Sequence, residues 1–391
     1  MPDSSDGEVP SDLSKQFKYI LRTSLLVFPI KCSKMQGAMR IGIVGTDLAP
    51  LDQEVGALEK LCRGWARELS QLGFEVILFS IPFLNGIDAG SPYLRTFSDQ
   101  DELDYKLLEA NLDAVIINNR PAWHGAGISK RINLFHNYPD AWMAATWENL
   151  NEQLSKTRNL AVSTALAEEI NQIFSKAQAS VLYPFIDQEI LNVRDMEQPD
   201  RLDRSSAPIR ALFPNRTLEK KGLRWLIETI DQHLDGMVSL TVIRNISPWT
   251  HETHEHRALL ELARSRSYIA VVEKIVNTSE LISLYRGHDV VITPSTRKEG
   301  LGLIPIEAQA VGTPVAASDL GGLRESVFEP NQTVPVGSTA ELARAILSVV
   351  EIPLSERESI AKLVAERFSP EVSTRNLVSE LQNLFDSNGL G

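Results

Sequence analysis

The chain has 391 residues, a length typical of two or three domains. Apolar residues make up 43% of it and charged residues 23%, so it can bury full-size hydrophobic cores. Its formal net charge of −12 argues against wrapping of nucleic acid, because the phosphate backbone favours a basic protein face. Two cysteines, Cys32 and Cys62, exclude a disulfide framework and a four-cysteine zinc site, and they favour a reducing cytoplasm.

The first 38 residues are predicted to be a disordered extension. Residues 1–13 are acidic and contain serine and proline. The apolar run at 25–30 follows basic residues and imitates a secretory signal, but it is short, contains Pro29 and lacks a small-residue cleavage site. No apolar run approaches the ~20 residues needed to span a bilayer. We therefore expect a cytoplasmic protein whose first domain begins at residue 39.

Short apolar runs alternate with helical patterns in the first half of the chain. A helix is predicted at 58–72, where apolar residues recur with helical spacing before Gly73. This alternation is typical of a doubly wound parallel sheet. The predicted strands are 40–45, 75–81, 113–117, 133–136 and 159–163.

A polar stretch at 197–208 interrupts the pattern and is predicted to be a linker. The alternation then restarts, so we expect two Rossmann-like α/β domains, 39–196 and 209–370, and a last helix within 371–391 that can pack back on the first domain. The expected strands of the second domain are 209–213, 238–243, 269–272, 290–293 and 314–317. The expected helices are 222–234, 256–264, 281–286, 305–311, 340–351 and 372–385.

Doubly wound sheets bind ligands at the carboxyl ends of their strands, so the loops after the strands are the candidate sites. In the loop after the first strand, Gly56 precedes a helix and lets backbone N–H groups approach an anion. The alternative is that Gly56 only makes the turn and Glu59 only favours the first helical turn. Gly42 and Gly45 do not form the G-x-G-x-x-G series, so a nicotinamide cofactor is not expected.

Two basic residues follow the first strand of the second domain. Arg216 and Lys221 lie on a strand-to-helix loop, where both can converge on one anion. The alternative is a solvated charge cluster that Glu219 partly neutralises.

The segment at 294–308 carries two carboxylates and two glycines. Glu299 lies in a loop and Glu307 about one turn into a helix predicted to begin near Pro305. Gly302 precedes backbone N–H groups of Leu303 and Ile304 that suit a diphosphate, and both carboxylates can accept hydrogen bonds from sugar hydroxyls. The alternative is that both glutamates are surface charges.

Taken together, four segments resemble retaining glycosyltransferases of family 4, the group 1 glycosyl transferases, which have the GT-B fold of two Rossmann-like domains facing each other across a cleft. The likeness spans residues 40–370 approximately. Ala57 and Asn215 stand where the family usually has glycine. The matching segments are GALE at 56–59, NR with KG at 215–222, EGLGLIPIEA at 299–308 and GTPVAASDLGGLRE at 312–325.

The resemblance implies a role for each of these residues. Arg216 and Lys221 would bind the donor diphosphate and stabilise the leaving nucleotide, Glu299 would hold hydroxyls of the transferred sugar, and Glu307 the ribose hydroxyls. The N–H groups of Gly302, Leu303 and Ile304 would complete the phosphate cradle, which Gly56 would close from the other domain. His136 resembles the histidine that these enzymes place near the transferred sugar, although a lone histidine in such a place is often structural.

The resemblance implies no cofactor besides the nucleotide-diphosphate sugar, and no metal, since Arg216 and Lys221 would do the work of a divalent cation. Asp99 and Asp101 form an Asp-x-Asp pair, but N-capping of the next helix explains that pair better. The spacing of HETHEH at 251–256 fits no strong zinc motif.

The expected function is transfer of a sugar, with retention, from a nucleotide-diphosphate sugar to a hydroxyl acceptor. Residues 40–196 contain 13 Lys and Arg against 21 Asp and Glu, a balance that disfavours anionic bilayers, so we expect a soluble acceptor such as a sugar, polyol or small natural product. Two alternatives stay open: a nucleotide-sugar 2-epimerase of related architecture, and an inactive partner subunit that binds the donor.

Overall fold

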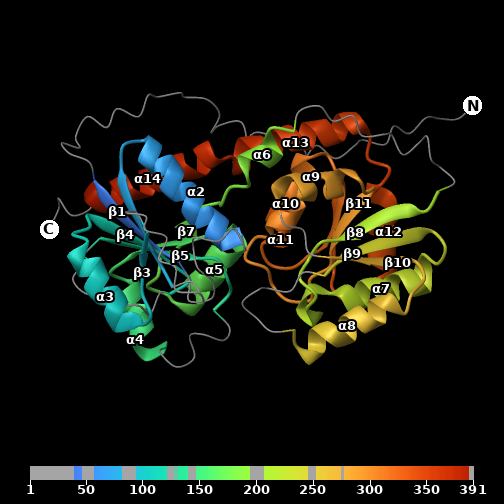
Figure 1. Cartoon of the computed structure of the whole chain (residues 1–391), viewed down its shortest axis with the longest axis horizontal. Helices are drawn as coiled ribbons and strands as arrows, with labels where there is room; N and C mark the ends of the chain where they lie inside the picture. Colours follow the sequence, from blue (N-terminus) through green and yellow to red (C-terminus); the bar gives the residue numbers. More distant parts are fainter. Residues whose placement is uncertain are drawn as a thin grey trace, which may run out of the picture. The chain divides into compact units, whose positions relative to one another are not determined.

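The computed structural model describes residues 39–45, 57–81, 94–120, 128, 130–139, 147–193, 207–244, 252–273 and 277–386 (Figure 1). All of them belong to one compact unit, Met39–Gly391. The expected extension at 1–38 and most of the expected linker at 197–208 lie outside the described residues.

Within the described residues, the first half forms a seven-stranded parallel sheet in the order β3-β2-β1-β4-β5-β6-β7. The strands are β1 (Arg40–Val44), β2 (Glu75–Ser80), β3 (Leu94–Thr96), β4 (Ala114–Asn118), β5 (Arg131–Phe135), β6 (Arg158–Ala161) and β7 (Ser180–Val181). The helices are α2 (Ala57–Gln71), α3 (Gln100–Glu109), α4 (Trp147–Leu154), α5 (Thr164–Ile173) and α6 (Gln188–Leu191).

The second half forms a six-stranded parallel sheet in the order β10-β9-β8-β11-β12-β13 within the part of the chain that the structure describes. Its strands are β8 (Ile209–Phe213), β9 (Val238–Ile243), β10 (Ile269–Val272), β11 (Val290–Thr293), β12 (Val315–Ser318) and β13 (Gln332–Val334). Its helices are η2 (Glu219–Lys221), α7 (Leu223–His233), α8 (His254–Arg264), α9 (Thr278–Arg286), α10 (Leu303–Ala310), α11 (Leu323–Ser326), α12 (Thr339–Val349), α13 (Leu354–Phe368) and α14 (Pro370–Asp386).

The prediction of two parallel-sheet Rossmann-like domains is therefore confirmed. Central strands such as β4 and β11 are buried along their whole length and apolar except at their last residues, Asn118 and Thr293, as expected for strands covered by helices on both faces. The strand order reverses at two neighbouring pairs, β1 with β4 and β8 with β11. Ligands of such sheets bind where the order reverses, so the loops after β8 and β11 are candidate ligand-binding loops.

The last helix, α14, packs against α2, as Figure 1 also shows. The indole N–H of the fully buried Trp65 donates a hydrogen bond of 3.1 Å to the hydroxyl of Ser373. An ion pair of 2.6 Å joins Arg158, on β6, to Glu380. The C-terminal helix thus contacts α2 and the sheet of the first half.

Several predicted boundaries differ from the structure. The helix predicted at 281–286 begins at Thr278, because the side chain of Asn277 caps its first turn. The helix predicted at 305–311 begins at Leu303, so Pro305 lies inside the first turn, where a missing N–H costs nothing. The helices α4, α5, α6, η2, α11 and α13 and the strands β3, β7 and β13 were not predicted; these strands have two or three residues, too few to show a period.

Candidate functional site

The loops after β8 and β11 lie against each other. Gly222 ends η2 with φ of 81°, a conformation that favours glycine, and a Cβ atom there would lie 1.7 Å from the carbonyl oxygen of Pro294. The backbone N–H of Thr296 donates to the carbonyl of Lys220 at 2.9 Å. The close contact at Gly222 therefore brings the basic segment after β8 next to the acidic segment after β11.

Lys221 and Glu299 form an ion pair in this contact. The ammonium lies 2.5 Å from Oε1 of Glu299, and the hydroxyl of Ser295 donates to the same oxygen at 2.7 Å. Burial raises the pKa of the Glu299 carboxyl, but Lys221 and the Ser295 hydroxyl outweigh it, so that the pKa lies below its ordinary value. Glu299 is thus held ionised, and its second oxygen can accept a hydrogen bond from a ligand hydroxyl.

Further cations surround this pair. Burial is the main cause that lowers the pKa of Lys220, and the charges of Arg216, Lys221 and Arg297 lower it further. The backbone carbonyl of Arg216 accepts from the N–H of Leu218, but the Arg216 guanidinium makes no hydrogen bond or ion pair with any residue that the structure describes. Four cations therefore share this region with the Glu299 carboxylate, and the resulting excess of positive charge suits an anion. Lys220 and Arg297 were not predicted from the sequence, although Lys220 is next to Lys221 and Arg297 lies two residues before Glu299.

The helix α10 begins at Leu303, shortly after Glu299 in the chain. Gly302 precedes the helix with φ of 92°, and no side chain caps the turn. The backbone N–H groups of Leu303 and Ile304 have no intrahelical partner at this end of the helix, where the helix dipole favours negative charge. These N–H groups are therefore free of a side-chain cap at the helix start, where we predict the phosphate cradle.

Glu307, farther along α10, lies against a buried tyrosine. The hydroxyl of Tyr285, on α9, donates to Oε2 of Glu307 at 2.8 Å, and Tyr285 is fully buried. Burial raises the pKa of Glu307, partly offset by the Tyr285 hydrogen bond and the charge of Lys60. Oε1 makes no hydrogen bond with a described residue, so it can accept a bond from a ligand hydroxyl. Tyr285 was not singled out from the sequence.

His136 follows β5 directly. Its backbone N–H donates to the side chain of Asn119 at 2.7 Å, and its Nε2 lies 2.9 Å from Oδ1 of Asn118. The Asn118 amide group donates to the carbonyl of Val44 at 2.8 Å, which turns Oδ1 toward the imidazole and favours the tautomer protonated at Nε2. Burial lowers the pKa of His136 to about 3, so the ring is neutral at physiological pH.

The segment that carries Glu299 meets the strand end that carries His136. A Cβ atom at Gly300 would lie 1.9 Å from the carbonyl oxygen of His136, and the hydroxyl of Ser163 donates to the carbonyl of Gly300. The structure therefore brings the predicted residues of the two sheets close together.

Of the predicted residues, Gly56 lies outside the described part of the chain. Glu59, one turn farther along, is only 6% exposed. Burial raises its pKa, and the charge of Arg216 acts in the opposite direction. The first turn of α2 is therefore within electrostatic range of the basic segment after β8, a link between the two sheets that sequence reasoning did not anticipate.

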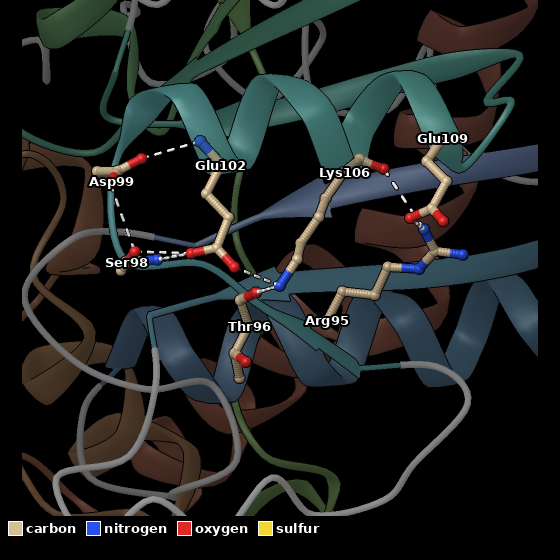
Figure 2. Close-up of polar contacts among 7 residues, drawn as sticks. All are labelled: Arg95, Thr96, Ser98, Asp99, Glu102, Lys106 and Glu109. Carbon is tan, nitrogen blue, oxygen red and sulfur yellow. Dashed lines mark hydrogen bonds and ion pairs between the residues drawn. The ribbon is translucent and has the colours of Figure 1, made fainter.

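Asp99, the first residue of the Asp-x-Asp pair, caps a helix, as predicted. The side chain of Asp99 accepts from the backbone N–H of Glu102 at 2.9 Å, and Glu102 accepts from the N–H of Ser98 at 2.7 Å (Figure 2). An ion pair of 2.7 Å joins Glu102 to Lys106. The side chains of Asp99, Glu102 and Lys106 thus make these contacts within α3 and at its cap.

The HETHEH segment also begins a helix. Thr253 caps α8, and the backbone N–H of Thr253 donates to Nδ1 of the buried His256 at 3.1 Å, which completes a capping box. His251 lies outside the described residues. Across the residues that the structure describes, no group of three or more histidine, cysteine or acidic side chains is placed to hold a metal ion, and no helix is long and apolar enough to cross a membrane.

Comparisons with known proteins find similarity to glycosyltransferases. Residues 209–351 match the family model described as "Glycosyl transferases group 1". A D-inositol 3-phosphate glycosyltransferase of Rhodococcus erythropolis is 40% identical over 126 residues, which cover 31% of this chain and 28% of that protein. The chain thus matches less than a third of the length of this relative. An uncharacterized glycosyltransferase of Methanocaldococcus jannaschii is 23% identical over 330 residues, 74% of this chain and 83% of that protein.

Solved structures show the same fold. The sucrose-phosphate synthase of Thermosynechococcus elongatus aligns with this chain at a TM-score of 0.71 and 18% identity. The alignment covers 89% of this chain and 100% of the synthase chain. HepE of Anabaena, crystallised in complex with UDP-glucose, aligns at a TM-score of 0.68 and 16% identity. This alignment covers 88% of this chain and 100% of the HepE chain. The chain therefore has the GT-B fold of these glycosyltransferases.

Proposed function

We propose that this protein is a retaining glycosyltransferase that moves a sugar from a nucleotide-diphosphate sugar to a small soluble hydroxyl acceptor, and that it needs no metal ion. One observation carries the proposal: several cations surround Glu299, which lies shortly before the uncapped first turn of α10, in the loops where β8 and β11 reverse the strand order. The match to group 1 glycosyl transferases covers this same segment and supports the assignment.

The charges fit the bond that has to break. When the anomeric carbon leaves the diphosphate oxygen, negative charge grows on the diphosphate, and preorganised cations and N–H groups stabilise that charge most. Arg216 makes no ion pair with a described residue, and Lys221 needs only to exchange its Glu299 partner for phosphate oxygens. We propose that these two side chains supply the stabilisation that a divalent cation supplies in other transferases.

The carboxylates would orient the donor. Glu307 offers one oxygen while Tyr285 holds the other, a geometry suited to ribose hydroxyls. Glu299, held ionised by Lys221, would accept hydrogen bonds from the transferred sugar, and His136 would line the same space from β5. In a retaining reaction of this type the acceptor oxygen bonds to the anomeric carbon on the face that the diphosphate leaves, and a phosphate oxygen takes the acceptor's proton.

The acceptor we propose is a sugar, a polyol or a small natural product. The acidic balance of residues 40–196 disfavours an anionic membrane. Two of the proteins similar to this chain are named for small polar products or acceptors, inositol 3-phosphate and sucrose phosphate, and this supports the same class.

A screen with UDP-, GDP- and ADP-glucose tests the proposal. We expect one nucleotide to be released only when an acceptor from a panel of sugars and polyols is present, with the product anomer matching the donor anomer. Release of free monosaccharide without acceptor would favour a 2-epimerase. Tight donor binding without nucleotide release across the panel would favour an inactive partner subunit.

A further inference from the structure

A carboxylate from the second half of the chain occupies the N-terminus of a helix in the first half. Glu325, on α11, accepts hydrogen bonds from the backbone N–H groups of Thr164 and Ala165, both at 2.8 Å, one on each oxygen. These are the first two residues of α5, whose N–H groups have no partner within the helix. A charged acceptor at this end also interacts favourably with the helix dipole.

The same carboxylate is held by a tyrosine of the first half. The hydroxyl of Tyr183 donates to Oε2 of Glu325 at 2.6 Å. Burial, followed by the hydrogen bond to Glu325, raises the pKa of Tyr183, which keeps the hydroxyl protonated and able to donate. The guanidinium of Arg367 lies 4.2 Å from the centre of the Tyr183 ring. Three donors therefore bind Glu325, and all three come from residues of the first half of the chain.

Backbone contacts join the two ends of the segment between Glu299 and Glu325. The N–H of Gly322 donates to the carbonyl of Glu299 at 2.8 Å, and Glu299 and Gly321 form an isolated parallel bridge. A Cβ atom at Gly322 would lie 2.2 Å from the carbonyl oxygen of Gly300. A displacement of Glu325 is therefore transmitted to the loop at 299–300 through rigid backbone contacts.

The start of α5 also holds that loop directly. Ser163, which caps α5, donates its hydroxyl to the carbonyl of Gly300. An ion pair joins Lys298 to Glu169, one turn farther along α5. The first turn of α5 thus binds the loop at 298–300 on one side and Glu325 on the other.

We propose that Glu325 is a positioning residue that anchors the Glu299 loop to the N-terminus of α5 and so keeps Glu299 aligned with His136 across the site. Glu325 acts through the backbone contacts of Gly321 and Gly322 rather than by touching substrate. What it positions rests on the proposed function, whereas the anchoring itself rests on the contacts alone.

The test compares full-length E325Q and Y183F with S338A and the unaltered chain. A glutamine has the size of glutamate but presents an NH₂ group that cannot accept from a backbone N–H. Y183F keeps the carboxylate and removes one of its three donors, which makes it the milder variant if E325Q folds poorly. S338A is the matched control, because Ser338 caps α12 by accepting from the N–H of Glu341 and contacts neither α5 nor the Glu299 loop in the structure as described.

Hydrogen exchange in the absence of ligand gives the first readout. In E325Q we expect faster amide exchange at 164–168 and also at 297–303, with a smaller increase in Y183F. S338A should lose a similar degree of thermal stability without changing exchange at 297–303. Faster exchange in E325Q confined to 164–168 would overturn the proposal, because Glu325 would then be a helix cap and no more.

Kinetics with the nucleotide sugar that the unaltered chain turns over gives the second readout. We expect kcat/KM to fall about tenfold or more in E325Q, the size of effect that loss of a charged hydrogen bond produces, and to stay unchanged in S338A. Unchanged kcat/KM in E325Q with faster exchange at 297–303 would refute the positioning role. If the unaltered chain turns over no nucleotide sugar, the proposed function fails while the exchange readout still decides the anchoring.

Discussion

Gly300 lies so close to His136 that a single added methyl group would collide with the peptide backbone. A Cβ atom at position 300 would be 1.9 Å from the carbonyl oxygen of His136. Gly300 follows Glu299, which pairs with Lys221, whereas His136 follows β5. The absence of a side chain at position 300 is therefore what lets the acidic loop of the second sheet reach the strand ends of the first.

Gly300→Ala should separate these two segments. Forcing a methyl group into a packed contact costs about 1–3 kcal/mol, and backbone atoms cannot turn aside as a flexible side chain can. We expect a lower melting temperature and a large loss of turnover. Gly287→Ala is the control, since its nearest neighbour would be the Ser283 carbonyl oxygen at 3.1 Å. Equal melting temperatures and equal activity for G300A and G287A would contradict this interpretation.

His136 should remain neutral through the physiological range. Burial lowers its pKa to about 3, below the ordinary value of about 6.5, so the unfolded chain binds the proton more readily than the folded one. The stability that this histidine contributes is fully present above about pH 6.5 and is lost as the pH falls toward 3. NMR spectra of ¹³C-labelled protein measure this, with the His136 ring signal assigned as the one that H136Q lacks. That signal should not shift between pH 8 and pH 5. A titration midpoint near pH 6.5 would show that the ring is solvated.

The parallel sheets were predictable because each strand is a short apolar run and each covering helix has its own apolar period. The edge strands β3 and β7 were not, since two or three residues show no period. In the site, the spacing of Glu299 and Glu307 around Gly302 indicated an anion and hydroxyl site without any structure. That prediction, which the variants proposed here test, needed only the local glycine and charge pattern.

Contacts between distant segments were beyond the sequence. Tyr285 holds Glu307 from 22 positions away, and Glu325 caps α5 from 161 positions away. A tyrosine in an amphipathic helix and a glutamate after a glycine pair have no distinctive pattern of their own. Lys221 and Glu299 were both singled out, but as separate ligands, and their mutual ion pair depends on the approach of two loops that Gly222 permits.

Glu307→Ala should weaken binding of the nucleotide sugar while the chain stays folded. Hydrogen bonds to a charged group contribute about 1.5–3 kcal/mol, which corresponds to an affinity loss of about tenfold to a hundredfold. Calorimetric titration with UDP, GDP and ADP measures it, with Glu228→Ala on the exposed face of α7 as control. Tyr285→Phe should give a smaller loss, because Glu307 keeps its charge but loses the donor that orients it. Undiminished affinity and turnover in E307A would refute the ribose assignment.

Arg216→Ala and Lys221→Ala, alone and together, should lower turnover more than donor affinity. Groups that stabilise charge present mainly in the transition state lower kcat when they are removed, with little change in KM. Arg216→Ala is the cleaner variant, because Lys221→Ala also leaves the Glu299 carboxylate without its ammonium. Lys176→Ala, which removes an exposed ion pair with Glu152, is the control.

The steady-state kinetics that measure kcat and KM for these variants also test whether the reaction needs a metal ion. EDTA should change the rate of the unaltered chain little, since we propose that side-chain cations neutralise the leaving diphosphate. Activity that collapses in EDTA and returns with Mg²⁺ or Mn²⁺ would disprove that assignment.

Anionic liposomes should not retain the protein at physiological salt. Each basic residue near an anionic membrane adds about 1 kcal/mol of attraction, and an acidic residue acts in the opposite sense. Residues 40–196 carry 13 Lys and Arg against 21 Asp and Glu, so the half of the chain expected to face the acceptor should be repelled. Co-sedimentation with phosphatidylserine vesicles measures this directly, and a chain without residues 1–38 separates any contribution of that segment. Binding that survives the deletion would place a membrane site within residues 39–391. A lipid acceptor would then replace the small soluble one.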